Sequence, residues 1–204
     1  ELYDRYKFKK LGTFTPEQFA STFKKVNASL WEKYNRNEIG KDDLRTARFQ
    51  LALNTLGMLE EDIPIDIGDV YLQLCPIKGH VIPFAFEILD YLKPKYQLHI
   101  ITNGFDDVQD LKLTRSRLRD YFDQVITSEK VGFKKPSREM FERTVALLEA
   151  DKKDCIMIGD NPETDIQGGI NAGLDVIYFN PEKQPHRLRV TYEIGCLSEL
   201  RHIL

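Results

Sequence analysis

The chain has 204 residues and a mass of 23.8 kDa, the size of one large domain or two small ones. Its 29 Lys and Arg residues against 32 Asp and Glu residues give a formal net charge of −3, which excludes a strongly basic nucleic-acid-binding protein and an acidic disordered tail. With 42% hydrophobic residues the chain can bury a sizeable core, and no apolar run approaches the roughly 20 residues that a membrane-spanning helix needs. We therefore expect a folded protein that binds neither a nucleic-acid polymer nor a membrane; its oligomeric state is left open.

The first 76 residues have a helical pattern without a convincing strand. Residues 1–7 read as part of a helix. Thr15 and Pro16 are typical of an N-cap and a first helical position. Apolar residues then recur every three or four positions, as on one face of a helix: Phe19, Phe23, Val26, Leu30 and Tyr34. Gly40 ends this segment and a second helix begins at Lys41, so we expect a small helical bundle over residues 1–76.

From residue 77 onward, helices and short apolar strands alternate. The expected strands are 97–102, 124–127, 155–158 and 175–179, and the expected helices are 82–92, 106–118, 138–150, 163–172 and 197–203. Strands that alternate with helices form parallel sheets with right-handed crossovers. Continuous apolar strands indicate that helices cover both faces of the sheet. The pattern therefore predicts an α/β fold with a parallel sheet over residues 77–204.

Two polar segments follow the first and second of these strands, at the edge where open α/β sheets bind ligands. The turn Thr102-Asn103-Gly104 can present a hydroxyl, an amide and backbone N–H groups to an anion, although it could equally serve only to cap the next helix. Lys135 precedes a proline, which favours an extended backbone. Its ammonium group could neutralise a phosphate or carboxylate, or it could be an ordinary solvated lysine.

Two carboxylates follow the third strand. Asp160 comes directly after its apolar run, and Asp165 lies five residues later in the first turn of a helix. Such a pair suits Mg²⁺, which takes few carboxylates, keeps several waters and accepts substrate phosphate as a ligand. Helix capping is the alternative, and it explains Asp165 better than Asp160. Taken with the other two strand ends, the pair favours phosphoryl transfer, which depends on charge neutralisation and positioning.

Three segments in this order resemble the haloacid dehalogenase superfamily of hydrolases: 100–105 (Ile-Ile-Thr-Asn-Gly-Phe), 131–136 (Val-Gly-Phe-Lys-Lys-Pro) and 158–166 (Ile-Gly-Asp-Asn-Pro-Glu-Thr-Asp-Ile). The residues at 102–105, 119–123 and 169–173 resemble the pyrimidine-type 5′-nucleotidase branch of that superfamily. The resemblance implies a Rossmann-like core over 77–204 and a helical-bundle cap domain over 1–76. The three cysteines are widely spaced and form no Cys-x-x-Cys pair, which indicates reduced thiols and so predicts a cytoplasmic protein.

The resemblance implies a Mg²⁺-dependent phosphatase that acts on a small phosphate monoester, with a nucleoside 5′-monophosphate favoured. The residues to which it gives a catalytic or phosphate-binding role are Thr102, Asn103, Gly104 and Lys135. Thr102 would hydrogen-bond the transferring phosphoryl group, and Lys135 would stabilise the nucleophile and the phosphoryl charge. Asp160 would bind Mg²⁺, and Asp165 would support the metal directly or through water. In the family reaction an aspartate attacks phosphorus and the aspartyl-phosphate is then hydrolysed.

The sequence departs from the family at the nucleophile. The nucleophile and the general acid belong to an Asp-x-Asp motif on the first core strand, and no such motif follows an apolar strand near the start of this chain. Asp62 and Asp66 have the wrong spacing. Either the sequence starts after that strand, or the protein is a pseudoenzyme; the retained Thr102, Lys135 and acid pair favour the first explanation. A non-catalytic binding module and a metal-independent dehalogenase remain as alternatives.

Substrate choice is expected to depend on the helical half. The candidates for contacts with the leaving group are Trp31, Tyr34, Arg45 and Arg48, although each could also be an ordinary core or surface residue.

Overall fold

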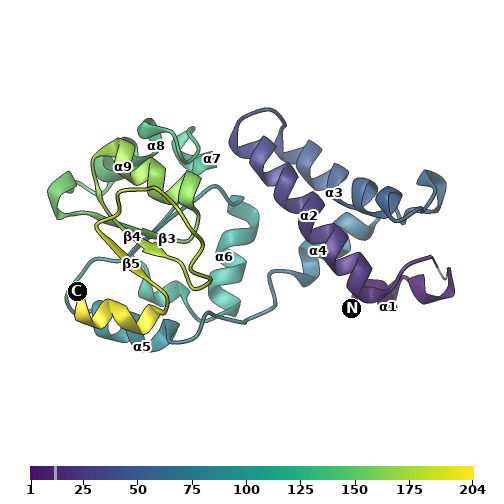
Figure 1. Ribbon diagram of the computed structural model, residues 1–204, viewed down its shortest axis with the longest axis horizontal. Helices are drawn as coiled ribbons and strands as arrows, with labels where there is room; N and C mark the ends of the chain where they lie inside the picture. Colours follow the sequence, from purple (N-terminus) through teal and green to yellow (C-terminus); the bar gives the residue numbers. More distant parts are fainter. Residues whose placement is uncertain (12) are drawn as a thin grey trace. The chain divides into compact units, whose positions relative to one another are not determined.

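The computed structural model describes residues 1–11 and 13–204, which form two compact units (Figure 1). Residues Glu1–Cys75 make up the helical unit, and residues Pro76–Leu204 make up the α/β unit. No helix in the described part of the chain is long and apolar enough to cross a membrane.

The helical unit contains four α-helices and two short 3₁₀ turns in its described residues: α1 (Leu2–Arg5), η1 (Phe8–Lys10), α2 (Pro16–Asn35), α3 (Lys41–Thr55), η2 (Glu60–Asp62) and α4 (Ile67–Leu74). The predicted start of α2 is confirmed, since the Thr15 hydroxyl accepts the Gln18 N–H at 3.2 Å and the Gln18 side chain accepts the Thr15 N–H at 2.8 Å. This reciprocal capping box satisfies two N–H groups that the helix cannot bond itself.

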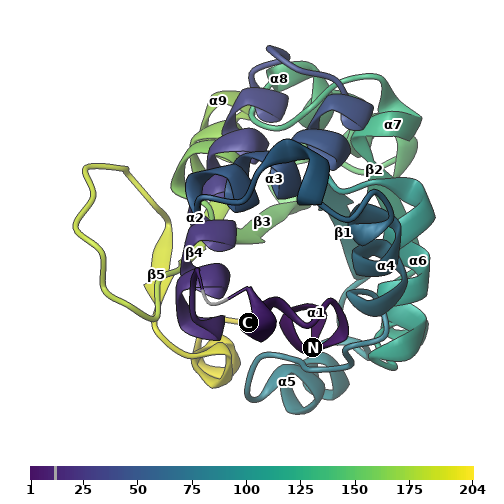
Figure 2. The same cartoon turned by 90° about the vertical axis from the view of Figure 1, so that its right-hand side faces the viewer.

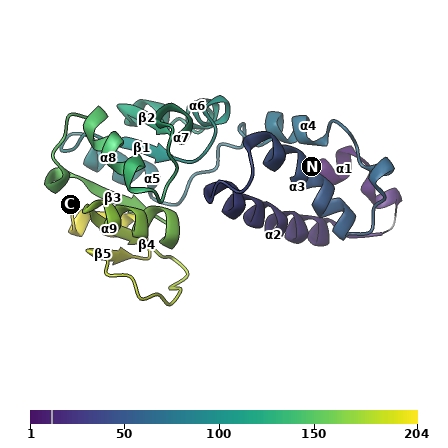
Figure 3. The same cartoon turned by 90° about the horizontal axis from the view of Figure 1, so that it is seen from above.

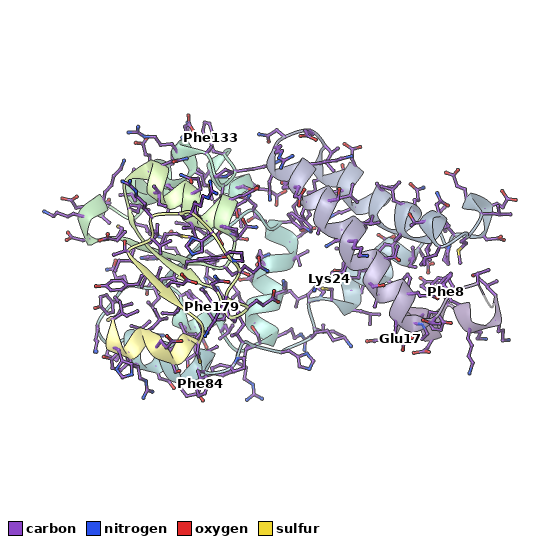
Figure 4. The ribbon with its side chains drawn as sticks, viewed as in Figure 1. Phe8, Glu17, Lys24, Phe84, Phe133 and Phe179 are labelled. Carbon is purple, nitrogen blue, oxygen red and sulfur yellow. The ribbon has the colours of Figure 1, made fainter. Side chains whose placement is uncertain are left out.

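An aromatic cluster joins the three longer helices of this unit. Phe8, labelled in Figure 4, is 2% exposed and packs beside Phe19 of α2. Phe23 of α2 stacks on Phe49 of α3 with 4.7 Å between the ring centroids. Tyr71 of α4 lies 5.4 Å from both of those rings. Aromatic pairs in this geometry contribute about 0.5–1.5 kcal/mol each beyond their buried area.

The α/β unit contains the following elements: α5 (Ala85–Leu92), β1 (His99–Thr102), α6 (Asp106–Arg115), η3 (Arg119–Tyr121), β2 (Gln124–Thr127), α7 (Ser128–Val131), α8 (Arg138–Leu147), η4 (Lys152–Asp154), β3 (Ile156–Gly159), η5 (Pro162–Gln167), α9 (Gly168–Ala172), β4 (Asp175–Phe179), β5 (Tyr192–Ile194) and η6 (Leu197–His202). The expected helix at 82–92 begins only at Ala85, because Phe84 has a left-handed backbone with φ 67°. The sequence did not indicate β5, a strand of three residues of which only Ile194 is buried.

All strand pairs are parallel, which confirms the predicted fold class. β1 pairs with β2, with His99 opposite Gln124, while β3, β4 and β5 form a second sheet in that order. Figure 3 shows the strands in the spatial order β2, β1, β3, β4, β5. In the described residues β1 and β3 each pair on one side only, so the five strands are divided into two sheets between β1 and β3.

Helices cover both faces of the strands, as predicted from the continuous apolar runs. One apolar cluster combines α8 and α9 with strand residues of both sheets, including Ile126, Met157 and Val176. A second cluster combines α5 and η6 with Ile177 and Ile194. In Figure 2, β1 of one sheet and β3 of the other are the strands that face each other across the break. The two sheets therefore share a core although no backbone ladder joins β1 to β3.

The capping box generates a test of the helical unit. Replacing Thr15 with Ala removes the acceptor of the Gln18 N–H, so the free energy of unfolding should fall by about 1 kcal/mol. Ser21→Ala is the matched control, because it removes an exposed hydroxyl within the same helix, where Ala is the better helix former. Urea unfolding should show no loss for Ser21→Ala, and equal losses for the two variants would contradict the capping role.

Candidate active site

Lys135 connects the two sheets of the α/β unit. Its side chain is 11% exposed, and its Nζ donates to the Ile101 carbonyl of β1 at 3.0 Å. The same Nζ donates to Asp165 Oδ1 at 2.6 Å, and Asp165 lies in η5, directly after β3. An ion pair this short between two largely buried groups needs both partners, since removing one leaves an unpaired buried charge at a cost of about 3–5 kcal/mol. Lys135 is thus fixed at the carboxyl ends of β1 and β3.

Asn103 holds the backbone of Lys135. Its Nδ2 donates to the Lys135 carbonyl and its Oδ1 accepts the Lys135 N–H, both at 2.8 Å. Asn103 is 8% exposed, so the paired bonds are shielded from water. The family resemblance implied a phosphate-binding role for Asn103. The structure adds a role for its side chain, which positions Lys135 from a point 32 residues away in the sequence.

The turn after β1 is ordered by its own hydroxyl. Thr102 Oγ1 accepts the Gly104 N–H at 2.9 Å, which folds residues 102–104 into a tight turn. A Cβ on Gly104 would lie 3.0 Å from that oxygen and closer still to the flexible end of Gln109. The turn brings the predicted residues Thr102, Asn103 and Gly104 beside Lys135, as the strand-end argument anticipated.

Asp165 accepts three hydrogen bonds. Its Oδ1 receives Lys135 Nζ and, at 3.3 Å, the Thr164 hydroxyl, while its Oδ2 receives the Asn161 N–H at 3.1 Å. Since a carboxylate offers about four lone-pair sites, one site on Oδ2 remains among the described contacts. A Cβ on Gly159 would lie 2.4 Å from Asp165 Cβ, so this approach of η5 to the end of β3 requires glycine.

Asp160 has a different environment from Asp165. It is exposed, and it directly follows Gly159, the last residue of β3. Its charge is nonetheless felt by Tyr178 on the neighbouring strand β4, where burial, Glu193 and Asp160 together raise the pKa of the phenol. Asp160 therefore offers an accessible carboxylate at the strand end, and Asp165 offers a carboxylate already held by the protein.

Neither carboxylate belongs to a ready-made metal cage. In residues 1–11 and 13–204, no group of three or more His, Cys, Asp or Glu side chains could hold a metal ion. Mg²⁺ seldom uses an all-protein site, so a donor set of two carboxylates, one of them exposed, fits it when water and phosphate complete the shell. The donor set thus suits direct binding through Asp160 and support through the open position of Asp165.

A second polar link was not predicted from the sequence. The Thr127 hydroxyl at the end of β2 donates to Asp106 Oδ1 at 2.6 Å. The Asp106 N–H in turn donates to Glu129 Oε2 at 2.7 Å. These bonds tie the start of α6 to the end of β2. Since α6 follows directly on the turn of residues 102–104, they also hold the end of that turn. The available signal was weak: a threonine that ends one strand and an acid at the start of one helix.

The predicted leaving-group residues all lie in the helical unit. Tyr34 and Arg48 are buried, at 5% and 4% exposure, while Trp31 is half-buried and its ring contacts Tyr34 edge to face at 5.5 Å. Arg45 is half-buried as well.

Comparison with known proteins identifies the family. Residues 18–179 match the haloacid dehalogenase-like hydrolase family. The chain is 34% identical over 198 residues to pyrimidine 5′-nucleotidase YjjG of Escherichia coli, covering 94% of this chain and 84% of that protein. It is 30% identical over 196 residues to pyrimidine 5′-nucleotidase PynA of Streptococcus pneumoniae, covering 94% and 82%.

Among solved structures, the HAD-hydrolase YfnB of Bacillus subtilis bound to magnesium superposes with a TM-score of 0.83 at 29% identity, covering 93% of this chain and 83% of that one. The family match and the two relatives confirm the resemblance seen in the three strand-end motifs. The chain belongs to the haloacid dehalogenase-like hydrolase family.

Proposed function

We propose that this protein is a Mg²⁺-dependent phosphatase that hydrolyses a small phosphate monoester, in the first place a nucleoside 5′-monophosphate, through an aspartyl-phosphate intermediate. The observation that carries the proposal is the buried Lys135, held by Asn103 and Asp165 at the carboxyl ends of β1 and β3. A fixed cation at the edge where α/β sheets bind ligands is suited to a phosphoryl group.

Lys135 has a hydrogen bond left for substrate. An ammonium group has three N–H donors, and the described contacts of Lys135 use two of them. The third can donate to a phosphoryl oxygen while Asp165 keeps the ammonium in place. Thr102 Oγ1 accepts from Gly104, so its own proton is free to be donated to a second phosphoryl oxygen. The two residues together would bind and orient the transferring group.

We place the attacking aspartate on a strand that runs between β1 and β3. Each of these strands leaves one edge without a ladder among the described residues, and unpaired buried backbone groups are costly. A parallel strand in this position would pair with both edges and end beside Lys135, which spans the same break through Ile101 and Asp165. The Asp-x-Asp motif would then lie within reach of the phosphoryl group.

Asp160 is proposed as the direct ligand of Mg²⁺, and Asp165 as a supporting ligand through water. When bound, Mg²⁺ would supply charge neutralisation for the transferring phosphoryl group. Asp160 is exposed and so accessible to a hydrated ion, whereas three protein donors already surround Asp165.

Two observations separate this proposal from its alternatives. Carbon–halogen cleavage in this family needs no metal, so a Mg²⁺-dependent phosphatase accounts better for the exposed carboxylate of Asp160 at the end of β3. A non-catalytic module has no need to hold a buried lysine by four hydrogen bonds, two with Asn103, one with the Ile101 carbonyl and one with Asp165. The two relatives named as pyrimidine 5′-nucleotidases favour a nucleoside monophosphate as substrate.

A substrate screen tests the proposal. The full-length protein should release inorganic phosphate from nucleoside 5′-monophosphates in the presence of Mg²⁺. No turnover of any nucleotide or sugar phosphate with Mg²⁺ present would contradict it, as would a residue other than Asp at the nucleophile position of the strand proposed between β1 and β3.

Metal removal provides a second prediction. EDTA should abolish phosphate release and added Mg²⁺ should restore it. Asp160→Asn should lower kcat by about 10²–10³-fold, the usual loss when one charge-stabilising group is removed. Asp154→Asn, which changes an exposed acid just before the same strand, serves as the control and should leave kcat unchanged. Phosphate release that survives EDTA would contradict the Mg²⁺ dependence, whereas halide release from a halogenated acid that survives EDTA would support the dehalogenase alternative.

The role of Asn103 gives a third prediction. Asn103→Ala leaves the buried N–H and C=O of Lys135 without partners, so the free energy of unfolding should fall by about 1–3 kcal/mol. Because Lys135 is no longer held, kcat should fall as well, while Mg²⁺ binding through Asp160 persists.

The control for this variant is Asn171→Ala, which removes one exposed side-chain hydrogen bond with Gln167 and should change stability by less than about 0.5 kcal/mol. Urea unfolding and steady-state kinetics measure both effects. A normal kcat for Asn103→Ala would show that the amide does not position Lys135.

A further inference from the structure

A glutamine of α6 lies against the turn that follows β1. The Gln109 N–H donates to the Phe105 carbonyl at 3.1 Å, so the residue ends the first turn of that helix. Side chains on a helix tilt toward its amino end. The carboxamide of Gln109 therefore reaches back over residues 102–104, the turn to which the proposed function assigns phosphate binding.

Gly104 permits this approach because it has no side chain. A Cβ on Gly104 would lie 2.0 Å from Gln109 Nε2 and 2.8 Å from its Cδ, distances at which atoms overlap. Since a Cβ is only one bond away from its Cα, the amide packs directly against the backbone of the turn. Gln109 thus occupies the space that a side chain at position 104 would otherwise take.

The Gln109 amide is not used to hold the fold. Its side chain makes no hydrogen bond within residues 1–11 and 13–204, and its polar atoms are not among the buried ones, so a ligand can reach them. Asn103, by contrast, uses both ends of its amide on Lys135. A carboxamide has two N–H donors and an acceptor oxygen, and Gln109 keeps all of them available.

Two donors converge beside this turn. Gln109 Nε2 and Thr102 Oγ1 lie 2.0 Å and 3.0 Å from one point, the Cβ position at Gly104, so they are at most about 5 Å apart. Hydrogen bonds of about 2.7–3.0 Å from each can meet at a single acceptor oxygen between them. Thr102 Oγ1 already accepts the Gly104 N–H, which leaves its proton for that oxygen.

The acid nearest in sequence to this pair of donors has its charge compensated. Asp106 Oδ1 accepts the Thr127 hydroxyl at 2.6 Å, and the Lys130 ammonium lies 3.9 Å from the same oxygen. A transferring phosphoryl group carries negative charge on three oxygens, and each donor aimed at one of them stabilises it. A neutral amide beside a compensated acid therefore suits an anionic oxygen.

We propose that Gln109 is a further phosphate-binding residue, whose Nε2 donates to the same phosphoryl oxygen as the Thr102 hydroxyl. The proposal rests on the proposed function, because a phosphate monoester supplies that oxygen. It deepens that function by adding a contact with the transferring group itself, which all phosphate monoesters share. Both residues belong to the α/β unit, so the contact needs nothing from the helical unit.

Direct binding tests the contact without catalysis. In the full-length ¹⁵N-labelled protein, the side-chain amide resonances of Gln109 are identified by their loss in Gln109→Leu. Inorganic phosphate added with Mg²⁺ should shift them, and chloride at the same ionic strength should not. Phosphate that binds without moving these resonances overturns the proposal, and so does a failure of the protein to bind phosphate at all.

Kinetics supply the second readout. Gln109→Leu keeps a good helix former of similar size but removes the donor. It should lower kcat/KM by about 10–100-fold, the usual contribution of a hydrogen bond to a charged group. The loss should be the same for nucleoside 5′-monophosphates and for p-nitrophenyl phosphate, because the amide contacts the group that they share. A loss confined to nucleotides would place the amide on the leaving group and overturn the proposal.

Two further variants control for the change of side chain. Gln109→Glu keeps the size but replaces the donor with a carboxylate that repels phosphate, so it should lose at least as much as Gln109→Leu. Gln124→Leu is the matched control, because this exposed glutamine begins β2 at the opposite edge of the sheet from the site. It should retain wild-type kinetics and phosphate affinity.

The outcomes separate this contact from the proposed function. If the wild type hydrolyses no phosphate monoester, the phosphatase proposal fails, and the phosphate titration still decides whether Gln109 binds the anion. If the wild type is active and both Gln109 variants keep its kcat/KM and phosphate affinity, the proposal for Gln109 fails alone. A purely structural role predicts a lower Tm with unchanged phosphate affinity, and that result also overturns it.

Discussion

The ion pair between Lys135 and Asp165 is the interaction on which the candidate site depends. At 2.6 Å, with both side chains about one-tenth exposed, it joins the segment after β2 to the segment after β3. The hydrogen bond of Lys135 to the Ile101 carbonyl adds the end of β1. Two sheets that share no backbone ladder are thus connected at their carboxyl ends by one ammonium group. Because each charge is the other's only described counter-ion, neither residue can be changed without exposing the other to the cost of an unpaired buried charge.

The ion pair needs support from residues that carry no charge. Asn103 fixes the Lys135 backbone through two bonds, and Gly159 allows η5 to approach the end of β3 so closely that any side chain there would collide with Asp165. The Asn161 N–H fixes the second carboxylate oxygen. A lysine has a long, flexible side chain, and its ordering costs up to about 2 kcal/mol of conformational entropy. These neighbours order the Lys135 side chain when the protein folds, so the ammonium is already oriented when a phosphoryl group binds.

Much of the fold and part of the site follow from the sequence. Periodicity located α2 and its capping box, and the apolar runs located β2 and β4 to the residue, because these features are local. The prediction placed Thr102, Lys135 and Asp165 close together because each follows a strand, and parallel strands align their carboxyl ends. The bonds between Asn103 and Lys135 and the bond from Thr127 to Asp106 could not be predicted. They join residues more than 20 positions apart and depend on the direction of each side chain. β5 was missed for a different reason: with one buried residue it has no apolar run to reveal it.

Lys135 and Arg48 are the cations buried in the described residues, and they differ in how their charge is compensated. Lys135 has a carboxylate partner, so its charge is compensated and its remaining donor can act on a substrate without a large energetic gain on binding. Arg48 has the Tyr71 ring against the face of its guanidinium, and its Nε and Nη2 have no acceptor among the described residues, so stacking rather than an ion pair compensates its burial. A cation whose charge is already compensated by a carboxylate, and which keeps one donor, is therefore the better suited of the two to bind and release an anionic group repeatedly.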